Sequence, residues 1–287
     1  MKPARFEYRC PTTVSAAIEQ LAEAGEEARF LAGGQSLIPL MGLRLAAPTR
    51  LIDLGRIPEL RYVEVADGLL RIGAMTTQRT LERSTAVAEA APLLAGAMPY
   101  IGHRAIRARG TIGGSVCHAD PTAELPVVLR ALDAEFVAQG PAGPRTIPAE
   151  DFFETLFTSA LQEDEMLVEV RIPTTTGRRW WFDEVSRRHG DFAIVSCAAI
   201  VGRNGDPPRV VLGGMASTPL RVEKAEQHIG GDPEAARAAA RVGVQDTDPT
   251  TDLHASAATR RRIAEALVAR ALRAVTATDG TSEGEKR

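Results

Sequence analysis

The chain contains the stretch Ala32-Gly33-Gly34-Gln35-Ser36 directly after an apolar run, and later a similar stretch, Thr111-Ile112-Gly113-Gly114-Ser115. Each stretch joins two adjacent glycines to small hydroxyl residues. Glycine has no Cβ, so main-chain N–H groups can turn toward one point and a ligand can approach them closely. Converging N–H groups bind an anion. Two such stretches therefore suit a ligand with two bridged phosphates, such as a dinucleotide.

The first stretch is expected to lie in a small α/β unit that covers residues 1–55. Thr12 or Thr13 can cap a helix whose apolar residues recur at helical spacing until Gly25 ends it. The other elements predicted for this unit are a buried strand (28–31), a short helical turn (37–41) and a second strand (50–54). The first of these strands therefore runs directly into the glycine stretch.

A second unit is predicted over residues 56–173. Asp67 and Gly68 separate two apolar runs, which is typical of a β-hairpin (61–65 and 69–73). Pro121 is expected in the first turn of a helix. The other predicted elements are helices (77–81, 87–97 and 122–132), a strand pair (135–138 and 145–147), an amphipathic turn (152–157) and a strand (165–172).

Residues 174–177 are predicted to mark a boundary, followed by a C-terminal domain over 177–277. This domain is expected to contain three strands (181–186, 193–201 and 209–212), a turn at Asn204-Gly205, and two helices (233–241 and 255–275). The last helix has an apolar stripe that should pack on the sheet, formed by Ile263, Leu267, Ala271 and Val275. The polar tail, 278–287, is expected to be disordered.

Composition limits the class of protein. The net charge is −3 and the pI is about 6.0, so a nucleic acid is not expected as a partner. No apolar run reaches the roughly 18 residues of a membrane span, and the N-terminus lacks the apolar core of a secretory signal. The cysteines Cys10, Cys117 and Cys197 show no CxxC spacing, so they predict neither a metal site nor an iron–sulfur cluster. A cytoplasmic, reducing compartment is the simplest expectation.

Several stretches resemble the FAD-binding middle subunit of the molybdenum hydroxylases, a family that includes carbon monoxide dehydrogenase and xanthine dehydrogenase. The four main ones are residues 31–39 (LAGGQSLIP), 101–115 (IGHRAIRARGTIGGS), 118–126 (HADPTAELP) and 213–216 (GGMA). Residues 186–191 (SRRHGD) and 255–257 (ASA) also fit. Either glycine stretch alone is weak evidence, whereas both together with the C-terminal signature are specific. The resemblance covers nearly the whole chain, residues 2–277.

The resemblance implies an α+β fold. A PCMH-type, vanillyl-alcohol-oxidase-like FAD-binding domain of two α/β subdomains would precede a C-terminal domain with a small antiparallel sheet and helices, and FAD would lie in the cleft between them. It also implies a heterotrimeric oxidoreductase with a large molybdopterin subunit and a small [2Fe–2S] subunit. This chain would take electrons from the small subunit on FAD and pass them to an external acceptor. A dimer of heterotrimers is the family expectation, and this chain sets neither the substrate nor the acceptor.

The resemblance further implies which residues hold FAD. Main-chain N–H groups and the Ser36 hydroxyl would bind the pyrophosphate, Glu124 would accept from ribose hydroxyls, and Lys224 would lie near the flavin. Ala108 stands where the family often has Asn, and Gln35 where it often has His. The expected cofactor contacts are Leu31, Ala32, Gly33, Gly34, Gln35, Ser36, Leu37, Ile101, Thr111, Ile112, Gly113, Gly114, Ser115, Glu124 and Lys224. No residue is expected to be catalytic or to bind a metal.

Some of these residues have simpler interpretations. Glu124 can be an acid in the first turn of a helix that interacts with the helix dipole, Lys224 a surface lysine, and Ile101 a part of the core. The basic segment 103–109 can clamp a phosphate, or it can be solvated or face another subunit. For the whole chain, the alternatives are a self-contained FAD-dependent oxidase and a non-enzymatic nucleotide-binding module.

Overall fold

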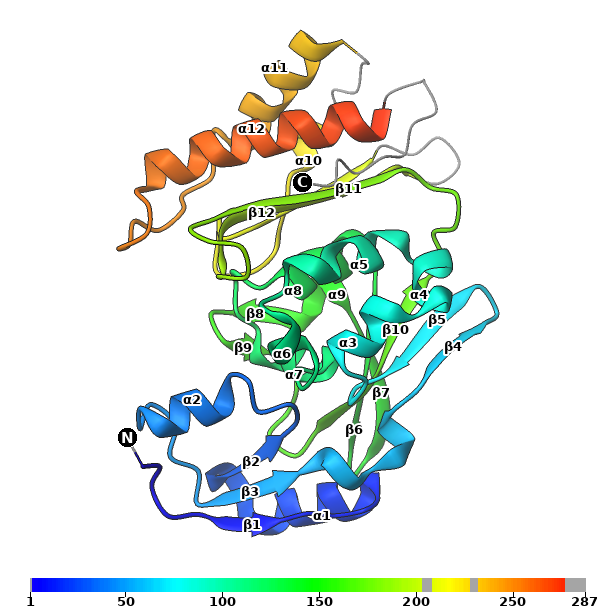
Figure 1. Ribbon diagram of the computed structural model, residues 1–287, viewed down its shortest axis with the longest axis vertical. Helices are drawn as coiled ribbons and strands as arrows, with labels where there is room; N and C mark the ends of the chain where they lie inside the picture. Colours follow the sequence, from blue (N-terminus) through cyan, green and yellow to red (C-terminus); the bar gives the residue numbers. More distant parts are fainter. Residues whose placement is uncertain (1, 203–207, 228–231, 277–287) are drawn as a thin grey trace.

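The computed structural model describes residues 2–202, 208–227 and 232–276, and its three parts follow one another along the long axis of the molecule (Figure 1). The N-terminal part has a three-stranded parallel sheet in the order β1 (Glu7–Arg9), β3 (Arg50–Asp53) and β2 (Ala28–Leu31). Thr13 caps helix α1 (Val14–Ala24) by accepting from the N–H of Ala16. Helix α2 (Leu37–Gly42) follows the first glycine stretch.

The central part is built on a five-stranded antiparallel sheet in the order β4-β5-β10-β6-β7. Its strands are β4 (Val63–Ala66), β5 (Leu69–Gly73), β6 (Glu135–Gly140), β7 (Gly143–Pro148) and β10 (Met166–Pro173). The predicted hairpin is confirmed, because Asp67 and Gly68 have φ angles of 53° and 75° and join β4 to β5. Positive φ at both central residues is what a two-residue type I′ turn requires.

The helices of the central part surround its core. They are α3 (Gln78–Arg83), α4 (Thr85–Ala90), α5 (Pro92–Ala97), α6 (Arg104–Arg107), α7 (Ile112–His118), α8 (Glu124–Ala131) and α9 (Ala149–Phe152). The short hairpin of β8 (Phe153–Thr155) and β9 (Thr158–Ser159) lies beside α7. Phe136, Phe152 and Phe153 pack their rings together in the same core as α5, α7 and α8.

The C-terminal part is a four-stranded antiparallel sheet with different elements on its two faces (Figure 1). Its elements are β11 (Trp180–Ser186), β12 (Ala193–Ile200), β13 (Arg209–Gly213), β14 (Leu220–Arg221), α10 (Glu223–Glu226), α11 (Pro233–Val244) and α12 (Ala257–Thr276). One face lies on α5 and α8, with Phe182 and Ala198 in the main core. The other face packs against α11 and α12, where the predicted α12 stripe joins Val195 and Leu212. This sheet therefore connects the outer helices to the central part.

The predicted mixture of elements is confirmed, and three predictions about helices and turns are wrong. The helix expected over 87–97 is divided into α4 and α5, because Pro92 starts a new helix and Ala91 has non-helical φ and ψ of −140° and 69°. The helix expected from residue 122 begins at Glu124, because the Asp120 carboxylate accepts from the N–H and hydroxyl of Thr122 and forms a turn. The turn expected over 152–157 contains strand β8.

Some sequence expectations were incomplete or cannot be compared. Strand β1 was not predicted, since its three residues are all exposed and carry no alternation, and the two-residue strand β14 is too short to recognise. One-turn 3-10 helices occupy Gly25–Glu27, Leu54–Arg56, Pro58–Leu60 and Met98–Tyr100. The predicted turn at 204–205 and tail 278–287 lie outside the described residues. None of the helices in the described parts of the chain has the length and apolar character that crossing a membrane requires.

Candidate functional site

The two glycine stretches, far apart in sequence, lie against each other. A Cβ atom on Gly114 would be 3.2 Å from the Cβ of Ala32, and one on Gly33 would be 2.3 Å from the main-chain oxygen of Arg109. Real Cβ atoms do not come that close to main-chain atoms, so Gly33 is required for the contact. The structure therefore joins the N-terminal part to the central part at the residues that the sequence singled out.

The first stretch forms an open turn between β2 and α2. Gly34 has a φ of +73°, a conformation that favours glycine. Gln35 folds back, and its side-chain amide donates to the main-chain oxygen of Gly33 at 3.1 Å. Among the described residues, no protein acceptor takes the N–H groups of Gly33, Gly34, Gln35 or Ser36. These half-buried donors are available to an anion.

The second stretch is not a loop, because Ile112, Gly113, Gly114 and Ser115 form the first turn of helix α7. The Thr111 side chain caps the helix by accepting from the N–H of Gly114 at 3.0 Å. Carbonyl oxygens of the protein accept from the other three N–H groups, namely Ile112 to Thr76, Gly113 to Ala74 and Ser115 to Thr111. The expectation of two N–H nests is therefore corrected to one nest, with the second stretch packed against it.

Ile101 lies at the edge of the main core, and Arg107 holds its main chain in place. The guanidinium of Arg107 donates to the carbonyl oxygens of Ile101 and Gly102, both at 2.9 Å, and pairs with Glu82 at 3.1 Å. Arg107 is buried, whereas Arg104 is exposed. The basic segment 103–109 therefore does not act as one phosphate clamp, because its buried arginine, Arg107, is used to hold the main chain at Ile101 and Gly102. Ala108 is exposed.

Glu124 is the first residue of α8 and is almost completely buried. Burial raises the pKa of its carboxyl to about 7. Nearby, burial lowers the pKa of His118, whose ring contacts that of Phe157 with centroids 5.1 Å apart. The Asp120 carboxylate is engaged by Thr122 in the turn before α8. Of the two carboxyls, that of Asp120 accepts hydrogen bonds within a turn. That of Glu124 makes no such turn contact, and its burial gives it a raised pKa.

The C-terminal signature closes the site from the other side. The N–H of Gly214 donates to the main-chain oxygen of Pro121 at 2.9 Å. A Cβ atom on Gly213 would be 2.7 Å from the side chain of Val127 on α8, so β13 lies directly on that helix. A Cβ atom on Gly190 would be 2.9 Å from the ring of His103, which places the loop between β11 and β12 next to Ile101.

Phe192 follows this loop, and the sequence analysis did not include it among the expected site residues. Its side chain is 60% exposed, which is unusual for a large aromatic ring. The sequence signal was its position directly after Gly190-Asp191, inside a stretch that already carried the resemblance. The structure adds the proximity of this loop to His103.

Lys224 is not joined to the glycine stretches. It lies on α10, whose Ala225 packs with Val222 in the core between the sheet and helices α11 and α12. Its Nζ pairs with the carboxylate of Asp246 at the surface. This is the face of the sheet opposite α8, so the expected position near the flavin has no support from the geometry.

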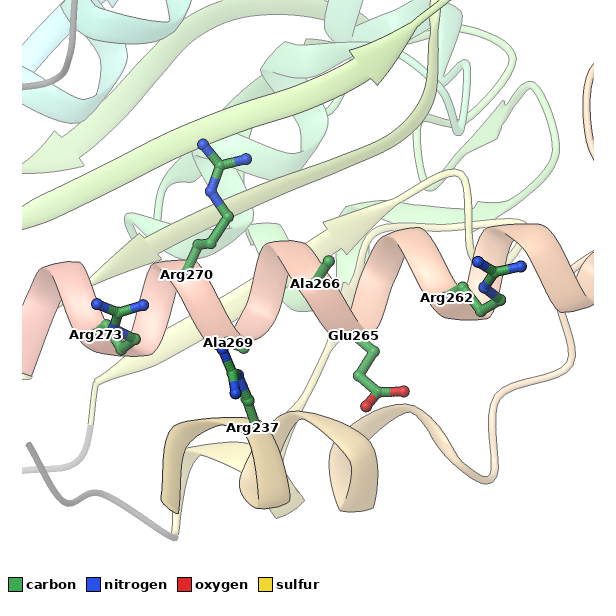
Figure 2. Close-up of a pocket in the computed structure, with 7 residues that line it drawn as sticks. All are labelled: Arg237, Arg262, Glu265, Ala266, Ala269, Arg270 and Arg273. Carbon is green, nitrogen blue, oxygen red and sulfur yellow. The ribbon is translucent and has the colours of Figure 1, made fainter. Parts of the chain in front are cut away.

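A groove of about 440 Å³ between α11 and α12 is also remote from the glycine stretches (Figure 2). Its charged lining residues are Arg237, Arg262, Glu265, Arg270 and Arg273. Arg270 points away from α11 and pairs with Asp183 on β11 at 3.1 Å. Elsewhere, within the described residues, no group of three or more histidine, cysteine or acidic side chains is arranged to hold a metal ion.

Comparison with known proteins agrees with this geometry. The family model of the FAD binding domain in molybdopterin dehydrogenase matches residues 4–175, and that of the CO dehydrogenase flavoprotein C-terminal domain matches residues 180–275. The chain belongs to this family of molybdenum hydroxylase flavoprotein subunits. The first match covers both glycine stretches, and the second covers the C-terminal signature, residues 213–216.

Full-length relatives of this flavoprotein subunit are known. The carbon monoxide dehydrogenase medium chain of Hydrogenophaga pseudoflava is 39% identical over 96% of this chain and 98% of the relative. The 6-hydroxypseudooxynicotine dehydrogenase complex subunit alpha of Paenarthrobacter nicotinovorans is 40% identical over 95% of each chain. A structure of quinoline 2-oxidoreductase from Pseudomonas putida 86 superposes with a TM-score of 0.92 at 34% identity, over 96% of this chain and 98% of that one. These likenesses confirm the predicted family and fold class.

Proposed function

We propose that this chain is the FAD-binding, electron-transferring subunit of a heterotrimeric molybdenum-containing hydroxylase. The observation that carries the proposal is the contact between the two glycine stretches in a chain of this family. That contact places the unpaired N–H donors of the first stretch beside α7, which packs on α8, the helix that begins with the buried Glu124. Activity therefore resides in the cofactor, and the protein supplies binding, orientation and electrostatics.

The residues of the first stretch fit a pyrophosphate. Gly33, Gly34, Gln35 and Ser36 present N–H groups that no protein acceptor takes in the described structure, and neutral donors bind a diphosphate without burying a cation. Leu31, Ala32 and Leu37 flank them. In our proposal the small residues of the α7 turn, Gly113, Gly114 and Ser115, leave room for the cofactor beside this nest, and Thr111 and Ile112 complete the turn.

The remaining proposed cofactor contacts lie at the interface between helix α8 and the C-terminal sheet, which we call the seam. We assign Glu124 to hydroxyl groups of the cofactor, because a carboxylate accepts two or more hydrogen bonds and this one has no cationic partner among the described residues. Ile101 would border the cofactor on its apolar side. Lys224 is left out of the proposed site. When bound, FAD would supply the electron-transfer chemistry between the iron–sulfur partner and an external acceptor.

The proposed assembly follows the relatives. We propose a large molybdopterin subunit and a small [2Fe–2S] subunit as partners, arranged as a dimer of heterotrimers in the cytoplasm. The three unpaired cysteines, Cys10, Cys117 and Cys197, suit a reducing compartment. Relatives carry names that refer to carbon monoxide, caffeine and nicotine-type compounds. The substrate of this complex is therefore assigned to the large subunit.

Co-expression with the two partner subunits tests this function. The chain should purify in a complex whose absorption spectrum contains both flavin and iron–sulfur bands. A complex made with the Gly33→Ala chain should keep the iron–sulfur bands and lose the flavin bands. A wild-type complex without flavin, or a chain that never joins the partners, would contradict the proposal.

A further inference from the structure

A group of polar side chains is buried where α8 meets the C-terminal sheet. In the pairing of β11 with β12, Glu184 lies directly opposite Ser196. Side chains alternate between the two faces of a sheet, so these two share a face with Phe182 and Ala198. Both of those residues belong to the main core. Glu184 and Ser196 therefore face the central part of the molecule and not α12.

Two atoms of this pair lack partners. The Ser196 side chain is fully buried, and its Oγ has no hydrogen-bond partner within residues 2–202, 208–227 and 232–276. The Oε2 atom of Glu184 is likewise buried without a partner in that part of the chain. A buried polar atom without a hydrogen bond costs free energy, and a buried unpaired charge costs much more. The arrangement therefore disfavours a carboxylate at Glu184.

Glu124 approaches from α8 and adds a second carboxyl to the same seam. It is 4% exposed, and its negative charge is one of the causes that raise the pKa of Glu184. Within the described chain, neither Glu124 nor Glu184 forms an ion pair with a lysine or arginine. A buried carboxyl and a half-buried one that share a region without a cation cannot both ionise easily.

The other titratable groups around Glu184 do not neutralise it. Asp183 adds negative charge from the opposite face, where it pairs with Arg270 of α12. The ring of Tyr100, beside Ile101, meets that of Phe182 edge to face with the ring centroids 5.0 Å apart, and Asp120 adds its charge near Glu124. Helix α5 and strand β12 bring no charged residue.

We propose that Glu184 is a positioning residue that keeps a proton next to Glu124, so that Glu124 is the carboxylate that accepts from hydroxyl groups of the cofactor. A protonated carboxyl is a neutral donor and acceptor, which lets Glu184 and Ser196 share the buried face without a second charge. The proposal rests on the proposed function, because it assigns Glu124 to the bound FAD.

The negative charge of Glu124 raises the pKa of Glu184, so Glu124 is the first of the two to ionise. Burial raises the pKa of Glu124 to about 7, and burial together with the Glu124 charge raises that of Glu184 to about 8. FAD affinity should therefore rise as Glu124 ionises and fall again when Glu184 places a second negative charge in the seam. For one ionising group the fall approaches about tenfold per pH unit.

Infrared spectroscopy of the wild-type chain measures the proton directly. At pH 7.5 and without added FAD, we expect the C=O stretching band of a buried protonated carboxyl, which disappears as the pH is raised. In Glu184→Gln the band at pH 7.5 should be weaker than in the wild type, because only the fraction of Glu124 that is still protonated contributes to it. In Glu124→Gln the band should titrate at lower pH, because the neighbouring charge is gone. A wild-type chain without this band at pH 7.5 would overturn the proposal, whether or not the variants fold.

FAD titrations across pH 6–9 give the second readout. Glu184→Gln should keep its FAD affinity near pH 7 and lose the alkaline decline, whereas Glu124→Gln should bind weakly at every pH. Glu64→Gln, on exposed strand β4, is the matched control and should follow the wild type. An alkaline decline that persists in Glu184→Gln would overturn this inference alone. A wild-type chain that binds no FAD at any pH would instead overturn the proposed function.

Discussion

Gly33 and Arg109 are packed so closely that a Cβ atom on Gly33 would lie 2.3 Å from the main-chain oxygen of Arg109. The residues come from different structural parts, with Gly33 after β2 of the N-terminal sheet and Arg109 before α7 of the central part. The contact positions the unpaired N–H groups of the first stretch beside the small residues of the second. The proposed cofactor site therefore depends on the absence of one side chain.

Gly33→Ala should abolish FAD binding, because the new methyl group must push the two stretches apart. Gly68→Ala is the control: Gly68 has a positive φ, of +75°, which Gly33 does not have, but no atom lies within 4 Å of its Cβ position. The control should lose about 1–2 kcal/mol of stability from backbone strain and keep its FAD affinity. Flavin titration and thermal unfolding of both variants separate the two effects, and full FAD binding by Gly33→Ala would refute the role of this contact.

Arg107→Ala should weaken FAD binding and lower the free energy of unfolding by about 3 kcal/mol, because it leaves Glu82 without its main partner and releases the carbonyl groups of Ile101 and Gly102. Arg79→Ala is a matched comparison, since Arg79 pairs with the same Glu82 at 2.6 Å. Its loss should affect stability slightly and FAD affinity not at all. Equal losses of FAD affinity in the two variants would show that Ile101 does not need this support.

Thr111→Ala should destabilise the chain by about 1 kcal/mol through the loss of the cap on α7. Because Gly114 lies against Ala32, we also expect weaker FAD binding. Thr111→Ser keeps the hydroxyl acceptor and should restore both quantities, as measured by chemical denaturation and flavin titration. A serine variant that behaves like the alanine variant would show that the hydroxyl cap is not the cause.

The stability of the chain without cofactor should depend on the ionisation of Glu124. The folded-state pKa of about 7 lies above the ordinary value of 4.5, so the folded chain binds more protons than the unfolded chain between these values. The contribution of Glu124 to the free energy of unfolding is fully present below pH 4.5. It is lost as the pH rises to about 7, and the loss is of order 3 kcal/mol. Glu124→Gln should therefore be more stable than the wild type at pH 8 and less sensitive to pH. Parallel pH profiles of the melting temperature in the two proteins would contradict this.

Much of the fold follows from local signals in the sequence. Thr13 and Gly25 delimit α1 as expected, and Asp67-Gly68 forms the predicted hairpin turn. These predictions succeeded because capping and turn chemistry depend on a few adjacent residues. The start of α8 was misplaced for a related reason, since the side chain of Asp120 competes with the helix for the N–H of Thr122.

The candidate site shows where sequence reasoning stops. The glycine stretches were recognised, but which N–H groups they leave unpaired depends on tertiary contacts such as that between Gly113 and Ala74. The position of Lys224 near the flavin, which the resemblance implies, stays a prediction, and the helix of Lys224 packs on the face of the sheet opposite α8. The pair of half-buried Glu184 and buried Ser196 was not predicted, because strand register brings the two residues together across twelve positions of sequence.

Titration of the purified chain with FAD, monitored by the quenching of flavin fluorescence, tests whether this chain binds the cofactor. We expect saturable binding of one FAD per chain, with a flavin spectrum that is retained on gel filtration and lost in Gly33→Ala but not in Gly68→Ala. A folded wild-type chain that takes up no FAD between pH 6 and pH 9 would contradict it.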